Sequence, residues 1–146
     1  MLLSNCIYAC SGRYIDNRFE FGGDNDIDKS FLDSAPLIVE NILIKKGTRV
    51  CPQEEEIKIE ISLSHKHDYN ISEIGFYLIP ENNISGISYL PDFPLKAIKG
   101  IDGKYYLNFN WFYDSLRKKQ KRIEFRIHTV DNVGYLHAGT QIYSIN

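Results

Sequence analysis

The sequence of 146 residues is short of several features that would assign it to a functional class. It has no hydrophobic run near the roughly 18 residues that a membrane-spanning helix requires. It has neither a phosphate-binding P-loop nor a glycine-rich dinucleotide fingerprint. Its 17 Lys and Arg nearly balance 19 Asp and Glu, for a formal net charge of -2, so no overall field attracts nucleic acid or an anionic membrane. We therefore expect no nucleic-acid partner.

Cysteine is scarce as well. The three cysteines, Cys6, Cys10 and Cys51, are odd in number and lack the paired spacing of a zinc site. They predict neither a complete disulfide framework nor a structural metal, and no cofactor is expected. Cys51 is the mid-chain thiol, and no sequence feature places a histidine base beside it, as a cysteine nucleophile would need. The sequence is therefore interpreted as that of a non-enzyme.

The first 35 residues leave two alternatives open. Residues 7–10, Ile-Tyr-Ala-Cys, have the outline of a bacterial lipoprotein box, but only nine residues precede Cys10 and none of them is basic. Residues 1–35 are either the remnant of an export signal with its linker or a short strand added to the domain. In the first case a lipid on Cys10 would be the chain's only contact with a membrane.

The residues that are abundant favour strands. Ten Tyr and eight Phe stand against one Met, a composition that suits sheets better than helices. Residues 56–64 alternate, with Ile57, Ile59, Ile61 and Leu63 on one predicted face. Similar strands are predicted in four other segments: 37–44 with a bulge near Asn41, 74–79, 105–111 and 123–129. In the last three of these the residues expected to share one face, and in the last two to face the core, are Ile74, Phe76 and Leu78, then Tyr105, Leu107, Phe109 and Trp111, and finally Ile123, Phe125, Ile127 and Thr129. The opposite face of 105–111, with Tyr106, Asn108 and Asn110, is expected to point away from the core.

The last predicted feature is a hairpin in residues 122–145, RIEFRIHTVDNVGYLHAGTQIYSI. Two alternating runs flank a turn at residues 131–134, where Gly134 supplies the positive φ that a tight connection often needs. We expect the first strand of this hairpin to be central in a sheet and the last strand to run along the same sheet.

About seven short strands, without a long helix or an internal repeat, predict an all-β fold, an antiparallel two-sheet sandwich. Residues 36–146 resemble the immunoglobulin-like and fibronectin type III-like domains of bacterial surface proteins. The resemblance rests on a proline-led strand at 36–44, an aromatic strand at 103–111, a short turn at 114–119 and an alternating strand that ends in Asp-Asn-Val-Gly at 134. It implies an immunoglobulin-like sandwich after an extended N-terminal segment, and a role as spacer, adhesion module or part of a larger assembly. No cysteine pair bridges two central strands, so an antibody-type domain is not indicated.

One cluster has the composition of a metal site. His65 and His67 are two residues apart on an extended segment and could share a metal with Asp68. His128 or His137 could complete the site if the loops converge. The alternative is that residues 65–68 form a solvated turn between strands.

The loop at 81–100 is the predicted binding surface. Its Tyr89, Leu90, Phe93 and Leu95 gather in a proline-rich stretch that cannot form a regular strand. The alternative is that this loop covers a sheet edge. Aromatic residues considered for an exposed platform are Tyr77, Tyr89, Phe93, Trp111 and Tyr135.

The functional hypothesis is a non-catalytic module of a bacterial cell-envelope or secreted assembly, located in the envelope or outside the cell. Its partner would be another protein or a second copy, bound through a sheet edge or the loop at 81–100. A second hypothesis is a component of a phage virion or contractile injection particle with the same fold. A third is a small metal-dependent enzyme that uses His65 and His67.

Overall fold

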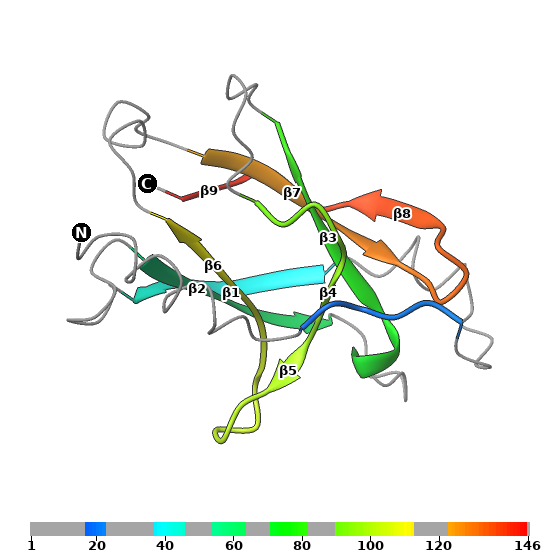
Figure 1. Cartoon of the computed structure of the whole chain (residues 1–146), viewed down its shortest axis with the longest axis horizontal. Helices are drawn as coiled ribbons and strands as arrows, with labels where there is room; N and C mark the ends of the chain where they lie inside the picture. The colour runs from blue at the N-terminus through cyan, green and yellow to red at the C-terminus, as the bar shows by residue number, and fades with distance from the viewer. Residues whose placement is uncertain are drawn as a thin grey trace, which may run out of the picture.

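The computed structural model describes residues 17–22, 37–45, 54–63, 71–81, 90–112 and 123–145 (Figure 1). Within these residues the fold is nearly all-β, and a single 3-10 turn is the only helical element. The elements are β1 Leu37–Lys45, β2 Glu54–Leu63, η1 Ile71–Glu73, β3 Gly75–Pro80, β4 Leu95–Lys96, β5 Ile98–Lys99, β6 Tyr105–Phe112, β7 Ile123–Val130, β8 Leu136–Gly139 and β9 Tyr143–Ile145.

The strands form two antiparallel sheets, as the sequence predicts. One sheet has the order β1-β2-β6-β5. The other has the order β4-β3-β7-β8, and β9 also pairs with β7. The register of β1 on β2 shifts between Val39 and Asn41, which confirms the predicted bulge.

The core lies between the sheets and is made by the alternating faces of the strands. Ile57, Ile59 and Ile61 of β2 are buried, and so are Phe125 and Ile127 of β7. The other core residues include Ile74, Phe76 and Leu78 before and within β3, and Leu107 and Phe109 of β6. Because each alternating row faces the opposite sheet, the predicted face assignments of β2, β3, β6 and β7 are confirmed.

The described residues contain nine strands in place of the expected seven. The connection between β3 and β6 contains the two-residue strands β4 and β5, which lie in different sheets. The last predicted strand is divided into β8 and β9, and both parts pair with β7. The hairpin prediction holds, since β7 is central in its sheet and Gly134 has a φ of 98°.

Residues 17–22, here called the strap, lie against the open side of β4 and continue to the turn between β7 and β8 (Figure 1). Arg18 forms an antiparallel bridge with Leu95, and the Phe19 N–H donates to the Pro94 carbonyl at 2.9 Å. The Phe19 ring is buried over Gly75, where a Cβ would stand 2.6 Å from it. The strap therefore packs on the sandwich, whereas the predicted division at residue 35 stays a prediction.

Asn17 at the start of the strap joins the two sheets. Its carbonyl accepts from the Lys96 N–H at 2.6 Å, and its side-chain amide donates to the Asn108 carbonyl of β6. The short strand β5 pairs only with Tyr105 and Tyr106 of β6, so Asn108 lies past the end of this pairing. This contact helps to explain why Asn108 is buried although it lies on the face of β6 that was expected to be exposed.

Candidate functional site

Asp131, the residue that follows β7, organises the turn of the β7–β8 hairpin. Its side chain is 2% exposed, and its Oδ1 accepts from the N–H groups of Val133 and Tyr135 at 3.0 Å each. Its own N–H donates to the Tyr135 carbonyl at 3.2 Å, and its carbonyl accepts from the Gly134 N–H at 3.1 Å. An aspartate that binds the backbone of the next residues in this way fixes a turn locally.

The second oxygen of Asp131 holds His137 of β8. The distance from Oδ2 to the His137 Nε2 is 3.1 Å, and both side chains are buried. Burial raises the pKa of the Asp131 carboxyl, but the bonds from the Tyr135 N–H, His137 and the Val133 N–H outweigh it and leave this pKa below its ordinary value. The carboxylate is thus ionised at neutral pH, and the His137 Nε2 carries the hydrogen of their bond.

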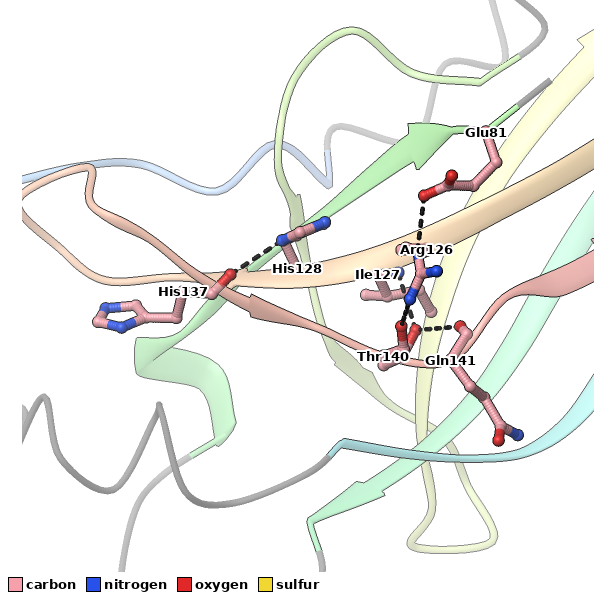
Figure 2. A network of polar contacts seen from close by, with 7 residues as sticks. All are labelled: Glu81, Arg126, Ile127, His128, His137, Thr140 and Gln141. Carbon is pink, nitrogen blue, oxygen red and sulfur yellow. Dashed lines mark hydrogen bonds and ion pairs between the residues drawn. The ribbon is translucent and has the colours of Figure 1, made fainter.

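The neighbouring His128 on β7 is held by the backbone of β8. Its Nδ1 lies 2.9 Å from the His137 carbonyl, and this nitrogen must donate because a carbonyl only accepts (Figure 2). The ring lies over Gly139, where a Cβ would come within 2.6 Å of the His128 Nε2. A side chain at position 139 would therefore displace the ring.

Arg126 connects three segments on the outer face of β7 (Figure 2). Its Nε donates to the Glu81 carboxylate at 2.7 Å, and its Nη1 donates to the Thr140 carbonyl at 2.9 Å. The Thr140 hydroxyl accepts from the Ile127 N–H at 3.1 Å and donates to the Gln141 carbonyl at 2.8 Å. These bonds fix the end of β8 against β7, so the hairpin is held at its tip and at its base.

The tip of this hairpin carries apolar side chains into solvent. Val133, Tyr135 and Leu136 are 69%, 59% and 52% exposed, and Phe21 of the strap is 54% exposed. Phe21 lies beside the turn, since a Cβ on Gly134 would be 3.8 Å from its ring. The Gly22 N–H donates to the Asn132 carbonyl at 2.9 Å, which fixes the strap to the tip. We call the surface formed by Phe21, Val133, Tyr135 and Leu136 the tip patch.

A second polar cluster lies around the turn between β5 and β6. The Tyr106 hydroxyl donates to the Asp102 carboxylate at 2.5 Å, and Lys104 pairs with Glu60 at 3.0 Å. The Tyr106 hydroxyl and the Lys104 N–H lower the pKa of Asp102, and the bond to Asp102 raises the pKa of Tyr106. Asp102 and Lys104 are exposed, and ion pairs that solvent screens in this way contribute little to stability.

In the described part of the predicted binding loop, residues 90–100, two of the four predicted binding residues lie in the core. Leu90 and Leu95 are buried, and Leu95 belongs to β4 at the edge of its sheet. Phe93 is half-buried, with the Arg18 guanidinium carbon 4.4 Å from its ring centroid, and Tyr89 lies outside the described residues. The burial of Leu90 and Leu95 favours the alternative in which this loop covers a sheet edge.

The predicted metal ligands His65, His67 and Asp68 lie outside the described residues. His128 and His137, considered as further ligands, bind the His137 carbonyl and Asp131. Among the described residues no group of three His, Cys, Asp or Glu side chains is placed to hold a metal ion. The metal hypothesis thus gains no support from the part of the chain that the structure describes.

Sequence reasoning considered Tyr135 as an exposed aromatic but did not find the tip patch. Of the other platform aromatics, Tyr77 donates to the Asp92 carbonyl at 3.1 Å, and the Trp111 side chain lies outside the description. The sequence did hold a signal for part of it: the apolar residues Val133, Tyr135 and Leu136 lie in or next to a predicted tight turn, where polar residues are usual. The contribution of Phe21 had no such signal because it depends on the path of the strap.

Comparisons of the chain with family models, curated proteins and solved structures find no match. The resemblance of residues 36–146 to immunoglobulin-like domains therefore stays a prediction. The structure itself shows a fold of two antiparallel sheets. In the described residues, no helix has the length and apolar character to pass through a bilayer.

Proposed function

We propose that the chain is a non-catalytic, immunoglobulin-like module that binds another protein through the tip patch. The observation that carries this proposal is the exposure of Phe21, Val133, Tyr135 and Leu136 around one turn. Apolar side chains that gather on an exposed surface are typical of interaction sites, and aromatic residues contribute most to binding energy there.

The hairpin supports binding because its shape is fixed before a partner arrives. Asp131 binds two N–H groups of the turn, and Arg126 and Thr140 tie the end of β8 to β7. A surface that is already ordered loses less conformational entropy on association, so more of the contact energy appears as affinity. Loops on a rigid β-scaffold commonly bind in this way.

The polar side chains of the hairpin support the non-catalytic interpretation. Asp131 and His137 are residue types found in catalytic pairs, but both side chains are buried. The Asp131 carboxylate binds the His137 ring with one oxygen and the N–H groups of the turn with the other. A general base must reach a proton on its substrate. In this position His137 instead holds β8 against the turn.

The wider setting of the proposal is a cell-envelope or secreted assembly of a bacterium. It is supported by the resemblance of residues 36–146 to domains of bacterial surface proteins. In such an assembly the tip patch would be the surface that meets a neighbouring subunit or an extracellular partner protein.

Crosslinking in the cells that naturally produce the protein tests the proposal. A photo-reactive residue in place of Val133 is expected to give a discrete protein adduct, which Leu136→Lys in the same chain should abolish. Leu136 is half exposed, so this change should leave the melting temperature nearly unaltered.

The control is the same photo-reactive residue at Ile101, a fully exposed apolar position in the turn between β5 and β6. It should give no discrete adduct. Equal adducts from both positions, or none from position 133, would contradict binding at the tip patch.

A further inference from the structure

The four-stranded sheet ends in a long strand whose outer edge is open among the strands that the structure describes. β1 has nine residues and pairs with β2, and no other described strand pairs with it. Ile38 and Leu43 on β1 are 38% and 44% exposed, beside Ser62 and Lys58 of β2. An open strand edge with apolar side chains is a template for pairing with another strand.

The side chains of β1 divide into two rows. Leu37, Val39, Ile42 and Ile44 lie opposite the inward-facing residues of β2, so they share the inner face of the sheet. Ile38, Asn41 and Leu43 lie opposite Ser62, Glu60 and Lys58, on the outer face. The bulge at Glu40 lets both rows continue across the register shift between Val39 and Asn41.

We propose that this edge pairs antiparallel with β1 of a second copy, about a twofold axis at Asn41 that is perpendicular to the sheet. Because Glu40 is the extra residue of the bulge, it is left out of the count. Ile42 then lies opposite the partner's Val39, Leu43 opposite the partner's Ile38, and Ile44 opposite the partner's Leu37. Every such pair joins residues of the same face, as antiparallel neighbours must. The two sheets become one continuous sheet of eight strands with closed symmetry.

The apolar pattern of β1 is the reason for choosing a second copy as its partner. In this register each exposed apolar residue of the outer face meets another one, because Ile38 and Leu43 exchange places across the axis. On the inner face Ile44, which is 42% exposed although it points toward the core side, meets the partner's Leu37. A strand of unrelated sequence would match both rows only by coincidence.

The polar residues of β1 are compatible with the pairing. The Glu40 carboxylate accepts from the Ser62 hydroxyl at 2.7 Å, so it turns toward β2 and away from the open edge. The two Asn41 side chains meet at the axis, and each amide can both donate and accept, as a symmetric pair requires. No like charges come to lie directly opposite each other.

Sedimentation equilibrium of the full chain over a wide range of concentration tests the dimer and its register. Ile38→Lys and Leu43→Glu, each alone, should raise the dissociation constant of the dimer about tenfold or more, because each puts a charge opposite an apolar side chain. The double variant Ile38→Lys/Leu43→Glu should recover most of the affinity, since its two substitutions face each other between copies.

Ile101→Lys is the matched control, because it adds the same charge at an exposed apolar position away from β1. It should leave the dimer unchanged, and far-ultraviolet circular dichroism should show every variant folded. A wild-type chain that stays monomeric, single variants that dimerise normally, or a double variant weaker than both singles would overturn the inference. The result is independent of the tip patch, because the β7–β8 hairpin that carries most of the patch belongs to the other sheet.

Discussion

At the scale of single residues, Asp131 is the buried charge that fixes the turn of the β7–β8 hairpin. It takes three hydrogen bonds with its two carboxylate oxygens while it is almost completely buried. Hydrogen bonds to a buried charge stabilise the fold only while that charge is present and every bonding partner stays in place. The geometry of the tip patch therefore depends on a residue that does not itself belong to the patch.

Asp131→Asn should destabilise the domain by about 2 to 4 kcal/mol near neutral pH, because the neutral amide offers one acceptor oxygen to the three donors that the carboxylate binds and carries no charge. The pKa of Asp131 is lowered in the folded state, so its stabilisation is present above the unfolded value of 3.8 and is lost as the pH falls through the folded pKa. Urea unfolding at several pH values should show the difference between wild type and variant shrinking in acid. A difference that stayed constant with pH would mean that the carboxylate charge is not what holds the turn.

The strap is the element whose place on the sandwich sequence reasoning could not predict, although a short strand added from residues 1–35 was one of its two alternatives. Its alternation in the sequence is weak, and what it covers, Gly75 and the end of β4, lies more than 50 residues away in the chain. By contrast β2 and β7 were predicted with the correct inner faces, because their alternation is strict and one face of each is buried. The positive φ of Gly134 and the bulge before Asn41 were also predicted from local chemistry.

What the sequence could not predict depends on contacts between distant segments. The burial of Asn108 follows from where β5 ends and where Asn17 lies. Leu90 and Leu95 were expected at a surface but are buried, because proline-rich chain can still contribute a two-residue strand to a sheet edge. The tip patch joins residues from both ends of the chain, and no local pattern records such a meeting.

Phe19→Ala should reduce the free energy of unfolding by about 3 kcal/mol, because the ring is buried over Gly75 and its removal leaves a cavity there. The strap should also loosen, so the Lys96 amide hydrogen, which donates to the Asn17 carbonyl, should exchange faster with solvent. Chemical denaturation and hydrogen exchange followed by nuclear magnetic resonance measure the two effects.

Phe21→Ala is the control for the strap, since this ring is more than half exposed, and it should change stability by less than about 1 kcal/mol. If the two alanine variants were equally stable and the Lys96 amide exchanged as in the wild type, the strap would not be part of the folded domain.

At the scale of the whole molecule, the two proposed surfaces belong to different sheets. The tip patch lies at one end of the sheet that contains β7. The strand β1 is the edge strand of the other sheet. A dimer through β1 would therefore leave both tip patches free, and a two-fold symmetric pair could hold two partner proteins. Two linked sites bind a multivalent target more tightly than one, provided that the geometry lets both engage.

The most direct test of binding at the tip patch is hydroxyl-radical footprinting of the protein within the complex recovered from its native cells, compared with the isolated chain. The account predicts that Tyr135, Leu136 and Phe21 become protected from oxidation in the complex, while Ile101 is oxidised equally in both samples. Unchanged oxidation of Tyr135 and Leu136 in a complex that protects other side chains would contradict it.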